Sequence, residues 1–162
     1  MDLPSRPDVR SASPMSFSQV VLRVLLAAGL GAAIGLEREF RQKPAGLRTN
    51  ILIAVGSALF SILSTRVAGG TPDRIAAQIV TGVGFLGAGA IMRGRTSIHG
   101  LTTAATIWVN AAIGMAAGLG ETAIATATAA VTLLVLIVLP PVEDYFERRA
   151  GLPNPHQNHR HG

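Results

Sequence analysis

The stretch TGVGFLGAGA, at residues 81–90, lies inside one apolar segment and is followed by another. Its glycines at positions 82, 84 and 87 spell GxGxxG, a pattern of soluble dinucleotide-binding domains in which an acidic residue follows about 20 positions later. Residues 101–111 contain no acid, and the segment before the glycines has the length of an apolar helix rather than of a short strand. We therefore interpret these glycines as contacts between helices packed in a bilayer.

The whole chain has the composition of a membrane protein. Of its 162 residues, 49% are hydrophobic and only 14% are charged, which is too apolar for an ordinary soluble domain. The charges fall in short clusters that leave apolar windows of roughly 17–20 residues, the length that crosses a hydrocarbon core of about 30 Å. The windows predict an all-α fold, a compact bundle of five transmembrane helices, at residues 20–36, 51–68, 75–92, 101–119 and 122–139. Only Gly120 and Glu121 separate the last two windows, which predicts a tight hairpin.

Basic residues are concentrated in alternate connections between these windows. The second connection contains only Arg66 and Arg74, and the fourth contains none, whereas the first and third contain Arg38, Arg41, Lys43, Arg48, Arg93 and Arg95. Because cytoplasmic loops are enriched in Lys and Arg, this bias predicts that the N-terminus lies outside and the C-terminus inside.

The segments outside the bundle predict little structure of their own. Residues 1–16 form a polar tail without the pattern of a cleaved secretory signal, and residues 17–140 form the membrane domain. Residues 141–162 are expected to be a short, disordered cytoplasmic tail.

Small residues recur at four-residue spacing within the predicted spans. Membrane helices pack through such residues because they let two backbones approach closely. The glycines expected at helix contacts, either within one bundle or between copies of the chain in a homo-oligomer, are Gly31, Gly35, Gly84, Gly114 and Gly118.

A few polar side chains fall inside the predicted spans, where each needs a partner or a wet cavity. They are Gln78 in the third span and Thr103, Thr106 and Asn110 on one face of the fourth. Asn110 is the most informative of these, because its amide can bind another helix or help to line a polar pocket. Trp108 lies in the middle of the same span and is expected to fill a packing gap.

Charged residues gather where the first span meets its loop, namely Glu37, Arg38, Glu39 and Arg48. Three interpretations stay open: an ion-pair network that anchors the loop, a surface that docks a partner, or a weak site for a hard cation, which the surrounding cations oppose. No Asp, Glu, Lys or His falls at the centre of a span, which argues against a proton-coupled carrier or a cation channel. No catalytic motif, metal-ligand pattern or cofactor site stands out, and we expect no enzyme.

Three segments resemble the MgtC/SapB family of bacterial membrane proteins. They are GLEREFRQKPAGLRTNILIAVGSALF at 35–60, RIAAQIVTGVGFLGAGAIM at 74–92 and GLTTAATIWVNAAIGMAAGLG at 100–120. The resemblance is dense from about position 29 to position 120 and looser over the fifth span. It implies a five-helix protein of the bacterial inner membrane.

The resemblance also implies a biological setting. Family members are linked to growth in low magnesium, stress adaptation and virulence, and they are described as inhibitors of other membrane proteins, notably the ATP synthase. We therefore expect a lipid bilayer and another membrane protein as partners, and no nucleic acid. The rival hypothesis is a transporter or channel for Mg²⁺ or another cation that uses Glu37 and the face of Thr106 and Asn110.

Two departures from the family pattern limit what the resemblance transfers. Many virulence-associated members have a soluble domain after the fifth span, so this chain is expected to be a short form. That branch also has Asn where this chain has Thr102 and Cys where it has Val109. We therefore expect the chain to share the family's fold, and the resemblance does not extend to that branch's role.

Overall fold

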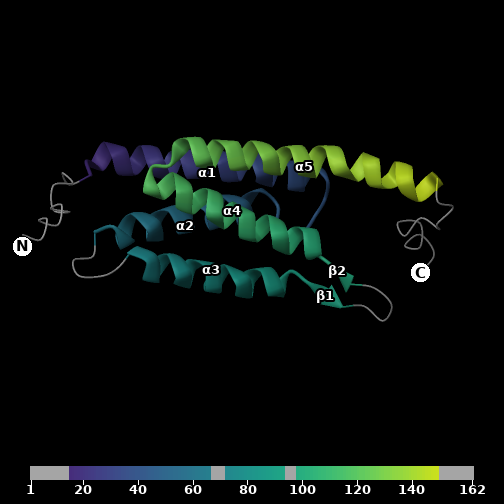
Figure 1. Ribbon diagram of the computed structural model, residues 1–162, viewed down its shortest axis with the longest axis horizontal. Helices are drawn as coiled ribbons and strands as arrows, with labels where there is room; N and C mark the ends of the chain where they lie inside the picture. Colours follow the sequence, from purple (N-terminus) through teal and green to yellow (C-terminus); the bar gives the residue numbers. More distant parts are fainter. Residues whose placement is uncertain (1–14, 67–71, 94–97, 150–162) are drawn as a thin grey trace, which may run out of the picture.

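The computed structural model describes residues 15–66, 72–93 and 98–149. Five helices in this part of the chain confirm the predicted all-α architecture. They are α1 (Phe17–Phe40), α2 (Leu47–Ser64), α3 (Pro72–Gly89), α4 (Leu101–Leu119) and α5 (Thr122–Arg149). A short antiparallel hairpin, β1 (Met92–Arg93) and β2 (Ile98–His99), lies between α3 and α4 (Figure 1).

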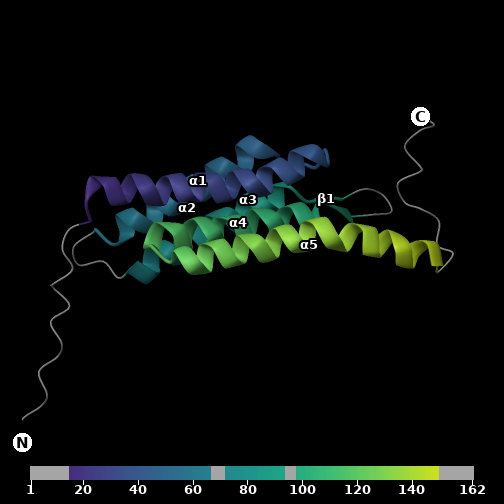
Figure 2. The ribbon, with the colours of Figure 1, turned by 90° about the horizontal axis from the view of Figure 1, so that it is seen from above.

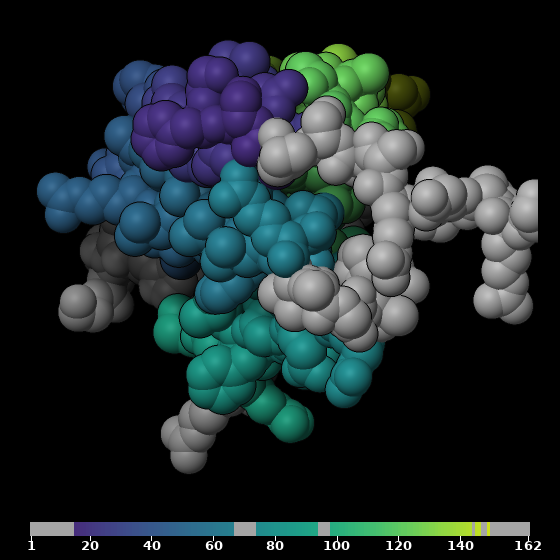
Figure 3. Space-filling model, turned by 90° about the vertical axis from the view of Figure 1, so that its left-hand side faces the viewer, coloured from purple at the N-terminus to yellow at the C-terminus, as the bar shows by residue number. Residues whose placement is uncertain are grey.

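The five helices lie side by side and run in alternating directions (Figures 1 and 2). One end of the bundle, the loop end, carries the connection at 41–46, the β hairpin and the last part of α5. The opposite end, the turn end, carries the tight α4–α5 hairpin, which the sequence predicted and the structure confirms. Figure 3 looks at the bundle from the turn end: α1 and the α4–α5 hairpin lie at the top, and α3 lies opposite them, at the bottom.

Helices α2 and α4 occupy the middle of the bundle, because α2 packs on α1 and α4, while α4 contacts all the other helices. Two apolar clusters form on the two sides of this pair. One, between α2, α3 and α4, comprises Ile53, Ile79, Val83, Ile107 and Ala111. The other, between α1, α2, α4 and α5, is rich in alanine and comprises Ala27, Ile34, Ala54, Ala58, Ile113, Ala117, Ala125, Ala129 and Leu136. Alanine in such a core keeps neighbouring helix axes close together.

The contact between α1 and α2 is made without side chains at two positions of α1. A Cβ added at Gly31 would lie 2.8 Å from the backbone oxygen of Asn50. A Cβ added at Gly35 would lie 2.8 Å from the Cα of Leu47. Both glycines therefore lie where the sequence placed helix contacts.

The contact between α2 and α4 is built in the same way. Added Cβ atoms at Gly114 and Gly118 would lie 2.8 Å from the Cα atoms of Ala54 and Ala58, respectively. Gly84 makes no helix contact within the described bundle, because it is exposed and an added Cβ would meet nothing within 4 Å, so that only the predicted contact between copies of the chain stays open for it. The reason is that α3 turns a different face toward α4, so that the glycines of this stretch do not all share one contact.

The fifth helix does not stop at position 139, where the predicted window ended and two prolines follow. It continues through Pro140 and Pro141 to Arg149, so residues 141–149 are helical and only 150–162 of the expected disordered tail lie outside the described residues. A proline inside a helix removes one backbone hydrogen bond, and Pro141 leaves the carbonyl of Ile137 without its helical donor. Nη2 of Arg41 on α1 lies 3.3 Å from that oxygen and donates to it. The side chain of Arg41, the residue that follows α1, thus replaces a backbone donor that α5 lacks.

Four of the helices, α1, α2, α4 and the first part of α5, are long and apolar enough to cross a membrane. Helix α3 is the exception, since Asp73, Arg74 and Gln78 dilute its first half. Large apolar side chains cover the outside of the bundle, as they do in proteins surrounded by lipid. The expectation for Trp108 was wrong: its side chain is 52% exposed rather than buried in a packing gap.

Candidate functional site

The last turn of α1 and the connection at 41–46 form a corner between α1 and α2. Three of the four charged residues singled out in the sequence, Glu37, Arg38 and Glu39, lie in it. Its backbone turns through two non-glycine residues in the left-handed region, Gln42 with φ 52° and Ala45 with φ 59°. Oε2 of Glu39 accepts a hydrogen bond of 3.0 Å from the backbone N–H of Leu47, the first residue of α2. A Cβ at Gly46 would collide with this carboxylate, so the absence of a side chain there lets Glu39 cap the helix.

Glu37 makes charge contacts on the same turn of α1. Its Oε1 lies 2.6 Å from Nε of Arg41, and its Oε2 lies 3.6 Å from Nη1 of Arg38. Both contacts are ion pairs, and neither carboxylate oxygen of Glu37 has a hydrogen-bond partner among the described residues. This arrangement supports the interpretation that the charges anchor the corner.

Arg38 and Arg48 differ from the carboxylates in what surrounds them. Arg38 is only 4% exposed, and its Nε has no hydrogen-bond partner in the described part of the chain. Arg48 lies exposed in the first turn of α2. The four predicted residues are therefore not one cluster: Glu37 and Glu39 brace the corner, Arg38 is buried and Arg48 points outward.

Asn110 lies at the contact between α4 and α2 and is fully buried. Its Nδ2 donates to the backbone oxygen of Asn50 at 2.6 Å and to Oδ1 of the same residue at 3.2 Å. Asn50 is also fully buried, and its own Nδ2 donates to the backbone oxygens of Ala45 and Gly46, the latter at 3.0 Å. A chain of amide hydrogen bonds thus connects the middle of α4 to the loop at 41–46.

Asn50 is the residue that the sequence analysis missed. It is the last letter of AGLRTN, in the first turn of α2, where an asparagine is ordinarily a solvated residue near a helix cap. Its partner lies 60 positions further along the chain. The signal available in the sequence was a second asparagine beside the membrane, but only the fold brings the two together.

The remaining predicted polar residues have local partners or face outward. Thr106 is buried, and its Oγ1 donates to the backbone oxygen of Thr102 at 2.7 Å within α4. Thr103 is buried near the loop end of the same helix. Gln78 is exposed and lines a groove of about 760 Å³ between α2 and α3, together with apolar side chains. The structure does not gather Gln78 with the α4 residues.

Arg23 is a further charged residue inside α1 that the sequence analysis did not single out. Its Nη1 donates to the backbone oxygen of Gly118 at 2.8 Å, in the last turn of α4. Its guanidinium lies against Gly120, which has φ 91° and ends the helix in the left-handed conformation. Arg23 therefore ties α1 to the α4–α5 hairpin at the turn end.

Among the described residues, no group of three or more His, Cys, Asp and Glu side chains lies close enough together to hold a metal ion. The structural features that stand out are instead the buried amide pair, the braced corner and the buried Arg38. They hold helices together and present cations at one end of the bundle.

Comparison with known proteins places these features in a family. A model of the MgtC family matches residues 24–145. The chain is 50% identical to the protein MgtC of Salmonella typhimurium (strain LT2) over 119 residues, which is 74% of this chain and 52% of that protein. It is 46% identical to the protein MgtC of Brucella abortus over 122 residues, or 75% of this chain and 51% of that protein.

A third relative is YhiD of Escherichia coli (strain K12), which is described as a candidate magnesium transporter. Identity with it is 51% over 130 residues, or 75% of this chain and 60% of YhiD. The chain spans a little more than half the length of these curated relatives. No solved structure matches it. The family model covers most of the membrane bundle described above, and the chain belongs to the MgtC family.

Proposed function

We propose that this chain is an inner-membrane protein of magnesium homeostasis and stress adaptation that regulates another membrane protein, such as the ATP synthase. Membership of the MgtC family and the description of YhiD support the connection with magnesium. Because the chain spans only part of its relatives, the activity of those whole proteins enters here as a proposal.

The observation that carries the regulatory proposal is the Asn50–Asn110 pair. A transport pathway requires polar groups that face a wet passage. Here the amide nitrogens of both asparagines donate to protein oxygens, and both side chains are fully buried. The pockets of about 510, 760 and 1080 Å³ are lined by other residues. These contacts of the two strongest uncharged polar groups in the middle of the bundle support a role as glue between helices rather than as the lining of a passage.

The alternative function, transport of Mg²⁺ or another cation, is favoured by the description of YhiD. Purified protein in liposomes separates the two functions. We expect Mg²⁺ and proton fluxes equal to those of empty liposomes, and a lower rate of ATP-driven proton pumping in inverted membrane vesicles that contain the protein. If the Mg²⁺ flux exceeds that of empty liposomes and proton pumping is unchanged, the protein is a transporter and the regulatory proposal is wrong.

The proposed contact with a partner is the loop end, where Arg48 is exposed beside the corner. We expect Arg48→Ala to abolish complementation of growth in low magnesium while the protein reaches the membrane in normal amounts. The matched control is Arg74→Ala, because Arg74 is also an exposed arginine near the start of a helix, α3, but lies at the opposite end of the bundle. If both variants complement fully, the exposed charge of Arg48 is not needed for contact with a partner, and the charges at the loop end only anchor the loop.

We also propose that all five helices cross the membrane with the N-terminus outside and the loop end in the cytoplasm, as the Lys and Arg bias indicates. The chain has no cysteine, so single cysteines report topology directly. With a membrane-impermeant thiol reagent on spheroplasts, we expect labelling of Glu121→Cys at the turn end and protection of Gln42→Cys at the loop end. The reverse pattern would invert the orientation.

A further inference from the structure

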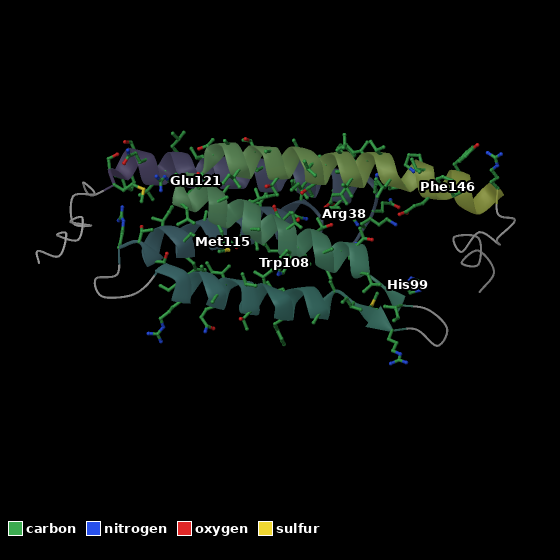
Figure 4. The ribbon with its side chains drawn as sticks, in the orientation of Figure 1. Arg38, His99, Trp108, Met115, Glu121 and Phe146 are labelled. Atoms are coloured by element: carbon green, nitrogen blue, oxygen red, sulfur yellow. The ribbon has the colours of Figure 1, made fainter. Side chains whose placement is uncertain are left out.

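A large pocket opens at the loop end of the bundle. It has a volume of about 1080 Å³ and lies between the end of α1, the β hairpin, the start of α4 and the region of α5 around its prolines. Arg38 and His99 mark this end of the molecule in Figure 4, far from Glu121 at the turn end. Neither Asn50 nor Asn110 lines this pocket.

Arg38 is the buried charge of the pocket. The side chain lines the pocket although the residue is only 4% exposed, and its Nε donor has no hydrogen-bond partner among the described residues. Its Nη1 lies 3.6 Å from Oε2 of Glu37, which is longer than a hydrogen bond. Buried donors nearly always have an acceptor, and a guanidinium has five N–H groups to satisfy. Arg38 therefore has unused capacity to bind an anion.

The other charges of the pocket favour the same kind of ligand. Arg41 and Lys43 line it beside Arg38, and among the described side chains that line it Glu143 is the acidic one. Glu37, next to Arg38 and Arg41, adds a second carboxylate close by. Among the described residues that line the pocket, three cations face one carboxylate, which favours an anionic ligand.

The start of α4 adds backbone donors to the same pocket. Its N-cap is Gly100, with φ 90° and no side-chain cap, and a Cβ there would collide with the carbonyl of Ala90. The first intrahelical bond of α4 runs from the N–H of Ala104 to the oxygen of Gly100, at 2.8 Å, so the three preceding N–H groups have no acceptor within the helix. Thr102 and Thr103, from this first turn, line the pocket. A helix N-terminus of this kind attracts phosphate groups.

The pocket also has an apolar wall. Val135, Leu136 and Leu139 of α5 line it, together with Leu101 of α4. A small inorganic anion has no apolar surface to bury against this wall, whereas a phospholipid has an acyl chain that can lie along it. The pocket lies at the end of apolar helices, where headgroups meet the hydrocarbon core.

We propose that this pocket binds the phosphate group of an anionic phospholipid, held by Arg38, Lys43 and the N-terminal amides of α4, with an acyl chain against α5. Arg41 is partly committed to Glu37 and to the carbonyl of Ile137 and acts chiefly as a nearby positive charge. The proposal depends on a membrane location, not on whether the protein regulates or transports.

The test is lipid retention measured by native mass spectrometry on the full chain, released from nanodiscs that contain equal amounts of phosphatidylglycerol and phosphatidylcholine. We expect the protein to retain phosphatidylglycerol in clear preference. A basic residue near a membrane surface contributes about 1 kcal/mol to attraction for anionic lipid, so Lys43→Gln should lower this preference about fivefold. Arg38→Gln, which also removes buried donors, should lower it roughly tenfold or more.

Arg74→Gln is the matched control, because it removes an exposed cation near the other end of the bundle and should leave the preference unchanged. If Arg38→Gln does not accumulate, Lys43→Gln alone decides, since Lys43 is exposed. Equal retention of the two lipids by the unaltered protein, or an equal loss in Lys43→Gln and Arg74→Gln, would overturn the proposal. Displacement of phosphatidylglycerol by excess inorganic phosphate would assign the site to a soluble phosphate and overturn the lipid as its source.

Discussion

Gly114→Leu is expected to keep the protein from accumulating in the membrane, whereas Gly84→Leu should accumulate at the level of the unaltered chain. A Cβ at Gly114 would already lie 2.8 Å from the Cα of Ala54, and the obstacle is backbone rather than a side chain that can rotate away. Overpacking of a well-packed core costs about 1–3 kcal/mol and occasionally more. Here it would also separate α2 from α4, whose contact holds the Asn50–Asn110 pair.

Gly84 provides a matched control, since it is also a glycine of a small-residue helix but has open space where a side chain would begin. The measurement is abundance in the membrane fraction together with the thermal midpoint in detergent. Normal abundance and stability of Gly114→Leu would mean that α2 and α4 do not approach as closely as described. Equal loss of both variants would place Gly84 at a contact with another copy of the chain.

The positions of the helices could be predicted from the sequence because the length of a span is set by the bilayer. Four-residue spacing of glycines likewise predicted faces suited to close approach, at Gly31, Gly35, Gly114 and Gly118. The same spacing could not show that Gly84 lies outside the contacts within the bundle, because a periodic pattern shows which residues share a face and not which face meets a neighbour. Only the position of α3 on the edge of the bundle decides that.

The end of the fifth helix was predicted too early for a different reason. Two consecutive prolines ordinarily end a helix, because each removes a backbone donor. In this protein a side chain of another helix, Arg41, donates to the carbonyl that Pro141 leaves unpaired. Such compensation joins residues 96 positions apart and has no local signature in the sequence.

The contacts at the candidate site also depend on structure that the local sequence does not specify. Charge density beside the first span drew attention to the corner where Glu37 and Glu39 make their contacts, but the contact that each residue makes depends on loop conformation. Glu39 can cap α2 only because Gln42 and Ala45 adopt left-handed backbone angles and Gly46 has no side chain. Neither conformation is specified by residue type, since both residues usually avoid it.

Asn110→Asp is expected to be among the most destabilising changes that the bundle can receive at a single polar position. The amide nitrogen of Asn110 faces two acceptors, the backbone oxygen and Oδ1 of Asn50. A carboxylate there has no N–H to donate and would place its oxygens against those acceptors. An ionised Asp at the centre of a membrane helix costs about 2.5–3.5 kcal/mol even without that repulsion.

Asn110→Leu is the matched comparison, because it removes the same hydrogen bonds without adding charge. An interhelical hydrogen bond in a membrane contributes about 0.6–2 kcal/mol, so Asn110→Leu should be only modestly less stable and should leave regulation of the partner measurable. Unfolding in detergent followed by far-UV circular dichroism gives the ranking, with Asn110→Asp expected well below Asn110→Leu. Equal stability of Asn110→Asp and the unaltered chain would show that the nitrogen is not the bonded donor. If Asn110→Leu kept full stability and abolished a Mg²⁺ flux that the unaltered protein supports, Asn110 would belong to a transport pathway instead.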